Sequence, residues 1–411
     1  MKIQKRAISL ACLAALGMAG AAQAAQVAGE ALEVYGNFYP EYLKTTFNDA
    51  GTGTLSTMTA GKNAPGVGAT PPKVKDDVTK IDWVNSYIGL KGQKAFGDIR
   101  AGFDVQGVIM DGNTVARSAL YGDARDAFVF VSHKKLGTLQ AGQFDTVYKE
   151  FGDKGLLGTS SGNFTSTSGI VSAVTWKAPS ANAAGTTSFN TRINGQVRWI
   201  SPNWGGVEVG LTYRPDPART YNQNASLSAM GARWSNETFT VALAQEVHND
   251  YRTVSGTGVA TDSATTIFSA SPSSKDTATR LTLGYKAGSL RVGSELVSLK
   301  YTEDATIAGN FTSYETTAWQ VSAEFNVSPQ VTVGGNFGKS AAGSCSLLGA
   351  DCSTDGLGGT MMSLGARYDL DKSVGFFALY GKSTVNSGAV LSSGNVGGDV
   401  TNMALGMQVR F

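Results

Sequence analysis

The chain is poor in the residue types that enzymes use for acid–base and nucleophilic chemistry. Its two histidines, His133 and His248, are far apart in the sequence, and His248-Asn249-Asp250 is the best candidate for a histidine beside a carboxylate. A catalytic serine or cysteine needs a base within hydrogen-bond reach, so this supply is too small for a triad. We expect both histidines to be surface residues, His133 in a short turn and His248 at a strand end. We predict that the protein is not an enzyme.

Metal and cofactor chemistry are also not indicated by the residue pattern. No cysteine and histidine spacing matches a zinc site, and no glycine-rich loop between a strand and a helix could cradle a phosphate. Cys345 and Cys352 bracket a short segment of an expected external loop, and in an exported protein a disulfide is favoured over two free thiols. We therefore expect no cofactor, and a disulfide that stiffens one loop.

The N-terminal segment indicates export. Basic residues Lys2, Lys5 and Arg6 precede an apolar run and a small-residue site that ends at Ala24. This pattern is typical of a secretory signal peptide, so we predict a signal at residues 1–24 and a mature domain at residues 25–411. Removing three of the 34 basic residues and none of the 32 acidic ones leaves a nearly neutral chain, which argues against nucleic acid as a partner.

The composition narrows the class of exported protein. With 51 glycines, 10 prolines and only 3 cysteines, the chain is not a disulfide-rich scaffold. Beyond the signal it has no apolar run of about 18 residues, so helical membrane spans are not expected. Many small and polar residues together with 9% aromatics are typical of a barrel with one lipid-facing and one watery side.

Alternation with a period of two residues predicts the elements that position the polar side chains. In the last segment, Met403, Leu405, Met407, Val409 and Phe411 alternate with polar or small residues. Successive side chains of a strand point to opposite faces, so one face of this strand is continuously apolar.

We place about sixteen such strands, and this even number favours an all-β, antiparallel transmembrane β-barrel in one domain. The predicted strands are Leu32–Tyr42, Val84–Gly92, Asp98–Gly107, Arg125–His133, Thr138–Phe144, Thr191–Ile200, Val207–Arg214, Ala225–Ser235, Thr238–His248, Thr279–Ala287, Leu290–Tyr301, Thr316–Phe325, Val331–Lys339, Met361–Asp369, Val374–Lys382 and Thr401–Phe411. Short turns alternate with long polar segments. We expect the short turns on the periplasmic side and the long segments outside.

Several segments, in this order, resemble the general porin family of Gram-negative bacteria. They are Leu32–Gly36, Ser86–Gly92, Leu136–Gln143, Ser201–Gly206 and the terminal Phe411. The resemblance implies a trimeric outer-membrane barrel of sixteen strands whose third external loop, from Asp145 to about Thr175, folds into the lumen and narrows it. It also implies that Phe411 is a signal for the outer-membrane insertion machinery, and that lipopolysaccharide surrounds the barrel.

The same resemblance suggests which residues constrict the pore. Glu150 and Asp153 lie in Lys149–Asp153, a segment similar to the family's acidic Glu-Phe-Gly element, and Asp145 opens the loop. Arg125 and Arg192 occupy positions that match the opposing arginine cluster. Arg100 and Arg198 fall on the polar faces of their strands and could extend it.

Two departures leave ion selectivity open. Tyr87 stands where an arginine is common in the family, and Asn37 replaces a basic residue. Opposed acidic and basic side chains across a narrow pore would orient polar solutes and sort ions.

Three functions remain open on the sequence alone. We expect a channel for passive diffusion of ions and small hydrophilic solutes. The alternatives are a substrate-selective channel with a saturable solute site, and a surface adhesin or structural barrel with a plugged lumen.

Overall fold

The structure, a computed structural model, describes residues 25–26, 32–48, 77–83, 86–108, 124–152, 189–190, 192–216, 224–250, 273–306, 308–352, 354, 358–390 and 396–411. The predicted signal peptide, the constriction candidate Asp153 and most of the expected external loops lie outside these ranges. Among the described residues, no helix is both long enough and apolar enough to cross a membrane.

The described chain is almost entirely strand. Its strands are β1 (Ala25–Gln26), β2 (Glu33–Phe38), β3 (Glu41–Asn48), β4 (Val78–Asp82), β5 (Tyr87–Phe96), β6 (Ile99–Val108), β7 (Ala124–His133), β8 (Gly137–Asp145), β9 (Arg192–Ile200), β10 (Val207–Arg214), β11 (Ser226–Ser235), β12 (Phe239–Asn249), β13 (Ser274–Ala287), β14 (Leu290–Glu303), β15 (Phe311–Asn326), β16 (Val331–Ser340), β17 (Ser344–Leu347), β18 (Gly359–Asp369), β19 (Val374–Val390) and β20 (Val396–Arg410). One helix of the described chain, α2 (Val147–Gly152), follows β8.

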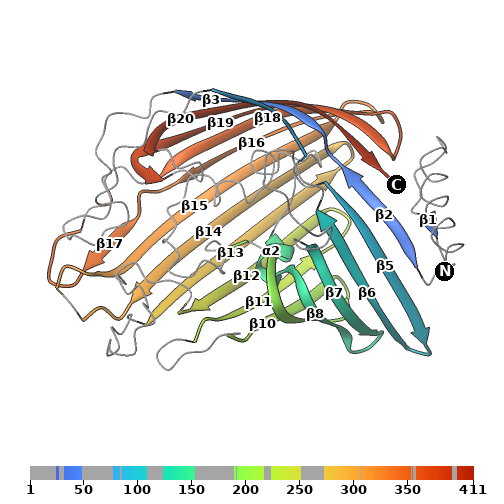
Figure 1. Ribbon diagram of the computed structural model, residues 1–411, viewed down its shortest axis with the longest axis horizontal. Coiled ribbons are helices and arrows are strands. Elements are labelled where there is room, and N and C mark those ends of the chain that lie inside the picture. Colours follow the sequence, from blue (N-terminus) through green and yellow to red (C-terminus); the bar gives the residue numbers. More distant parts are fainter. Residues whose placement is uncertain are drawn as a thin grey trace, which may run out of the picture.

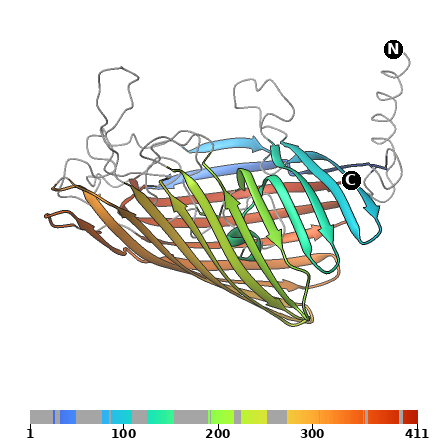
Figure 2. The same ribbon diagram turned by 90° about the horizontal axis from the view of Figure 1, so that it is seen from below.

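Antiparallel pairing closes these strands into a barrel. Each wall strand pairs with the next, and β20 returns to pair with β2 and β3, for example through Asn37↔Arg410 and Thr45↔Asn402. Figure 1 shows the red C-terminal strands beside the blue N-terminal ones, and Figure 2 shows the strands running slantwise around the wall. With the short strands β1 and β17 left out, β2 and β3 counted as one interrupted strand, and β4 and β5 as another, the described wall has sixteen strands, as predicted.

The burial pattern is that of a membrane barrel. Leu364 and Leu405 are 57% and 62% exposed on the outer face, whereas their strand neighbours Ser363 and Ala404 are buried on the inner face. Glu295, Gln320 and other polar residues are buried inside the barrel as well. Apolar side chains on the outside and polar ones within reverse the usual arrangement of a water-soluble protein, and this is the arrangement that a lipid solvent requires.

The short turns predicted from the sequence connect neighbouring strands of the barrel. The turn between β13 and β14 contains Gly288 at φ 55°, and the turn between β5 and β6 contains Gly97 at φ 64°. Glycine reaches this left-handed region without a steric penalty, so both hairpins reverse tightly. Because neighbouring strands are antiparallel and the short turns follow alternate strands of the wall, these turns lie at one end of the barrel.

Several predicted boundaries were wrong, because strands such as β13, β15, β19 and β20 extend further than predicted. The expected first strand, Leu32–Tyr42, is divided into β2 and β3 around Pro40, which has no N–H to donate to a ladder. The expected first loop, Leu43–Trp83, contains the rest of β3 and the strand β4 that pairs with it.

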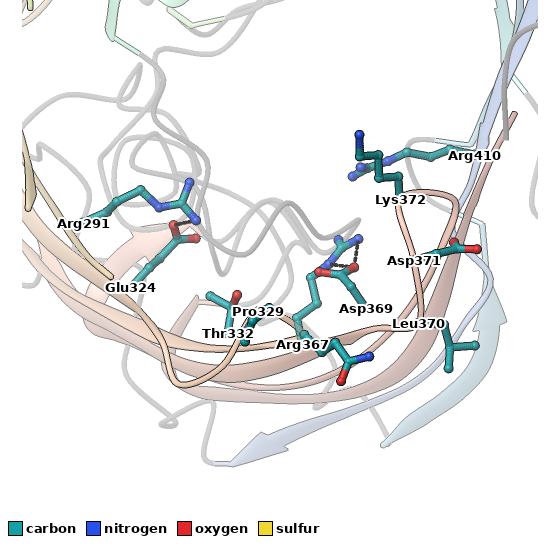
Figure 3. A pocket seen from close by; sticks show the side chains of 11 residues that line it. Arg291, Glu324, Pro329, Thr332, Arg367, Asp369, Leu370, Asp371, Lys372 and Arg410 are labelled. Atoms are coloured by element: carbon teal, nitrogen blue, oxygen red, sulfur yellow. Dashed lines mark hydrogen bonds and ion pairs between the residues drawn. The ribbon is translucent and has the colours of Figure 1, made fainter. Parts of the chain in front are cut away.

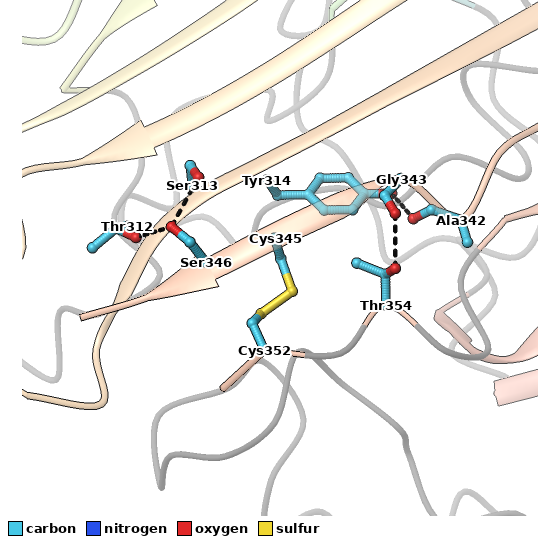
Figure 4. The surroundings of a disulfide bond; sticks show 9 residues. All are labelled: Thr312, Ser313, Tyr314, Ala342, Gly343, Cys345, Ser346, Cys352 and Thr354. Atoms are coloured by element: carbon cyan, nitrogen blue, oxygen red, sulfur yellow. Dashed lines mark hydrogen bonds between the residues drawn. A yellow bond between two sulfur atoms is a disulfide. The ribbon is translucent and has the colours of Figure 1, made fainter. Parts of the chain in front are cut away.

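The predicted loop after β16 also contains a strand. β17 pairs with the outer part of β15, and Cys345 of β17 is joined to Cys352 by a disulfide with a Cα–Cα distance of 5.8 Å. Figure 4 shows the Tyr314 ring above this bond, and its hydroxyl donates to the Ala342 carbonyl at 2.9 Å. The disulfide therefore closes a small hairpin that extends the barrel wall.

Candidate pore constriction

The helix α2 lies inside the barrel, against the inner wall (Figure 1). Val147, Tyr148 and Phe151 are completely buried. The wall beneath them is built from small residues: Ala229, Ala242, Ala244, Ala278, Gly210 and Gly231. A Cβ at Gly210 would lie 2.7 Å from a Val147 methyl carbon, so the wall approaches the helix too closely for a larger residue. Small side chains on four neighbouring strands thus form the seat of α2.

A buried polar cluster holds the start of the helix. The Thr146 hydroxyl donates to the Glu246 carboxylate, and the Val147 N–H donates to the Thr212 hydroxyl at 3.2 Å. His248 lies 2.9 Å from the other Glu246 oxygen and stacks on Phe189 at 4.5 Å between ring centroids. These contacts satisfy polar groups that would otherwise be costly to bury.

The surface location that we expected for His248 was wrong. Its side chain is only 1% exposed, because β12 turns this position to the inner face, where Phe189 covers it. His133 is the last residue of β7 rather than part of the turn that follows, and its Nδ1 accepts from the Lys135 N–H at 3.1 Å.

A buried arginine holds the end of the helix. Arg280 of β13 donates to the Tyr148 carbonyl at 3.3 Å and to the Asn190 side chain at 2.7 Å, and its guanidinium lies 4.3 Å from the centroid of the Tyr148 ring. Its Nε is 3.2 Å from Glu295, an ion pair without the geometry of a hydrogen bond. A Cβ at Gly152 would overlap the Arg280 side chain, so only glycine leaves room for this contact. Burial also raises the pKa of the Tyr148 phenol above its ordinary value.

Glu150 and Arg198 meet where the helix faces the lumen. The two side chains form an ion pair, with Arg198 7% and Glu150 36% exposed. Arg198 also donates to the Asp145 carbonyl at 2.7 Å and to Gln140 at 2.6 and 2.8 Å, and it lies over the Phe144 ring. The predicted acidic and basic partners are therefore in contact, rather than facing each other across an open gap.

Arg192 joins a second charged group close to the first. Its Nε lies 2.6 Å from Asp126 and 3.2 Å from Asp145. Lys149 of α2 lies 3.1 Å from the same Asp145 carboxylate. Arg125 packs over the Tyr87 ring at 5.2 Å, so the tyrosine that replaces the family's common arginine supports a neighbouring arginine instead.

An irregularity in the pairing of β6 with β7 determines where the Arg125 and Asp126 side chains lie. The register between β6 and β7 shifts between Val105 and Gly107, which leaves Arg125 and Asp126 together opposite Gln106. A bulge of this kind interrupts strict alternation and redirects a side chain. Both neighbours can consequently contribute to one cluster.

The structure does not bring every candidate into this cluster. Arg100 lies at the short-turn end of β6, six residues before Gln106, which corresponds to roughly 20 Å along the strand. Asp153 lies outside the described residues. Of the predicted residues, the described cluster beside α2 therefore contains Asp145, Glu150, Arg125, Arg192 and Arg198.

Sequence reasoning missed several participants. Asp126 was hidden by the bulge, and Lys149 was noted only as part of a motif. Arg280 and Glu295 lie on the polar faces of predicted strands, but their pairing across β13 and β14 depends on a register that a single sequence does not provide.

A further polar group lies on the wall formed by β2, β5 and β6. The Tyr35 hydroxyl donates to Asp104 at 2.5 Å and accepts from Gln106 at 2.9 Å. Lys91 forms an ion pair with Glu33 at 2.9 Å. This group continues the charged lining of the inner wall beyond α2.

Comparisons with known proteins agree with this architecture. The sequence model of the Gram-negative porin family matches residues 9–388 of this chain. A search of curated protein sequences gives no match.

Three solved structures illustrate the similarity in fold. The anion-selective porin from Comamonas acidovorans has a TM-score of 0.67 at 14% identity, and the match covers 92% of this chain and 99% of that one. OmpF of Salmonella typhi in complex with daunomycin has a TM-score of 0.58 at 14% identity, covering 95% and 100%. The trimer form of OmpT from Vibrio cholerae has a TM-score of 0.56 at 12% identity, covering 92% and 99%.

The family match extends over nearly the whole chain, and the described strands close into a barrel with a polar interior. The chain therefore belongs to the Gram-negative porin family and is an outer-membrane channel for the passive diffusion of solutes.

Proposed function

We propose that α2 and the charged side chains around it form the selective constriction of the channel, through which ions and small hydrophilic solutes diffuse without a saturable site. The observation that carries this proposal is the seating of α2 on the inner wall, with Glu150 and Arg198 paired beside the lumen. A fixed helix in a water-filled barrel narrows the path, and fixed charges at the narrow point act on every passing ion.

The charge balance favours a modest preference for anions. The described members of the cluster include four basic residues, Arg125, Arg192, Arg198 and Lys149, against three acidic ones, Asp126, Asp145 and Glu150. The similar fold of the anion-selective Comamonas porin is consistent with this direction. An excess of one positive charge attracts anions and repels cations at short range.

The experiment that tests both proposals is recording from purified protein in a planar bilayer with a potassium chloride gradient. We expect large, stable conductance steps. We also expect a reversal potential whose sign shows that chloride is more permeant than potassium. Silence from correctly folded protein would contradict the channel, in favour of a plugged or adhesive barrel. A reversal potential of the opposite sign, with potassium more permeant than chloride, would contradict only the anion preference.

A liposome swelling series separates open diffusion from a saturable channel. For uncharged sugars of increasing size, we expect rates that grow in proportion to concentration and fall steeply with size. A plateau at low concentration for one solute would favour the substrate-selective alternative.

Assembly and export complete the proposal. We infer a homotrimer, because OmpT of similar fold forms a trimer, and we propose lipopolysaccharide and the insertion machinery as partners in the outer membrane. Phe411, proposed as the insertion signal, stacks on Phe38 at 5.6 Å between ring centroids where the barrel closes. Light scattering of the detergent-solubilised protein tests the trimer. The intact mass of the exported chain tests cleavage of the signal after Ala24.

A further inference from the structure

A second charged region lies inside the barrel at the end where the short turns gather. It surrounds a cavity of about 750 Å³ whose lining includes four basic residues, Arg291, Arg367, Lys372 and Arg410, and three acidic ones, Glu324, Asp369 and Asp371. Arg410 lies two positions after the buried inner-face residue Gln408, so the alternation of β20 turns it inward. The cavity therefore belongs to the mouth of the channel and is separate from the constriction.

Each of the three carboxylates of the cavity already accepts an ion pair or hydrogen bonds from nearby groups. Glu324 pairs with Arg291 at 2.8 Å, and Asp369 pairs with Arg367 at 2.7 Å (Figure 3). Asp371 accepts from two backbone N–H groups of its own turn at 2.7 and 2.9 Å, and these bonds lower the pKa of its carboxyl. The carboxylates are thus directed to their own partners.

Two of the four cations have no such compensation. Among the described residues, none forms an ion pair with Lys372 or Arg410, and the Arg410 guanidinium donates to the neutral Gln408 side chain at 2.7 Å. Figure 3 shows both side chains extending over the cavity from neighbouring elements. Arg367 lies beside the same space, and a Cβ at Gly375 would be 2.9 Å from its guanidinium, so glycine leaves room for this side chain.

We propose that this cavity binds small multivalent anions, phosphates and carboxylates, at the short-turn mouth of the channel. Binding rests on the proposed channel function, because such anions reach the site through the lumen. Guanidinium and ammonium groups are the side chains that pair with phosphate and carboxylate oxygens, and the two that lack ion pairs converge on one space. The site concentrates anions where they enter or leave the constriction.

The test is the block of the chloride current by inorganic pyrophosphate, added to each side of a planar bilayer in turn. We expect stronger block from one side, because the cavity lies at one mouth only. In Lys372→Gln/Arg410→Gln, the pyrophosphate concentration that halves the current should rise by roughly three- to tenfold, since two cations are removed. In this double variant, pyrophosphate should block equally weakly from both sides of the bilayer.

Two matched variants separate the cavity from general charge at the rim. Lys134→Gln/Lys135→Gln removes two exposed cations from the turn between β7 and β8, outside the cavity lining, and should leave the block within about twofold. Lys372→Arg/Arg410→Lys keeps both charges and should retain the block. Equal weakening in the rim and cavity variants would overturn the proposal, as would the absence of block in the unaltered protein.

Assembly is checked independently. Arg410 adjoins Phe411, so Lys372→Gln alone is measured as well and should show a smaller change of the same sign. Stable, discrete conductance steps without pyrophosphate, whatever their size, show that a variant has folded and inserted. Loss of all conductance in the unaltered protein would instead contradict the proposed channel function, so the two failures are distinguishable.

Discussion

Glu150 is the acidic residue through which α2 meets the arginines of the wall. Its partner Arg198 also has hydrogen bonds to Gln140 and to the Asp145 carbonyl. Replacing Glu150 with glutamine should consequently leave Arg198 in place while removing one negative charge from the proposed constriction. We expect the ratio of anion to cation permeability to rise about two- to fivefold, measured from the reversal potential in a potassium chloride gradient.

Glu237→Gln is the matched control for this prediction. Glu237 is exposed in the short turn between β11 and β12, and its loss removes the same charge at the rim. The reversal potential should change much less in this variant. An unchanged potential in Glu150→Gln would show that Glu150 does not act on passing ions.

At the scale of the element, α2 depends on the buried pair of Arg280 and Glu295. Arg280→Met removes the bonds to Tyr148 and Asn190 and takes away the cationic partner of the buried Glu295 carboxylate. Removing one partner of a buried ion pair typically costs about 3–5 kcal/mol. We expect a loss of this size in the free energy of unfolding in urea, together with greater noise in the open-channel current as α2 loosens.

The double variant Arg280→Met/Glu295→Gln distinguishes a buried charge from lost packing. Neutralising Glu295 removes the buried negative charge that has lost its cationic partner, so a substantial part of the stability should return. The current noise should remain, because α2 still lacks its contacts with Arg280. No recovery of stability would mean that packing alone explains the first result.

The disulfide between Cys345 and Cys352 should act locally. A closed loop this short, with a sequence separation of 7, stabilises its segment by about 2–3 kcal/mol in the chain-entropy description. In Cys345→Ser/Cys352→Ser, we expect faster proteolysis within β17, measured by mass spectrometry of the fragments. The thermal unfolding temperature of the barrel should hardly change, because β17 pairs with the outer part of β15 and lies beyond the ladder that joins β15, β16 and β18. A large fall in this temperature would contradict a local role.

The elements differ in how far the sequence predicts them. The strands were predictable because each one alternates between lipid and lumen, as at Leu364 and Ser363. The short helix α2 lacks a periodic pattern of its own and is held by tertiary contacts with the wall. The cluster of Arg125 with Asp126 depends on a bulge, and the burial of His248 depends on Phe189, which is distant in sequence. Such features follow from pairing register and from long-range packing, which local patterns do not contain.

At the scale of the whole molecule, the barrel is stable only in a solvent that matches its reversed surface. Leu364 is 57% exposed to the outside on β18, while its neighbour Ser363 is 1% exposed and faces inward beside Asn336. An arginine on the lipid side must leave water, whereas an arginine on the lumen side can extend into the aqueous interior. Leu364 is the central residue of β18, so Leu364→Arg should lower the free energy of unfolding in phospholipid vesicles by about 2–4 kcal/mol. Ser363→Arg should lower it less and should change the conductance instead. If both variants lost the same stability, the wall would not separate lipid from water in the way that its alternation indicates.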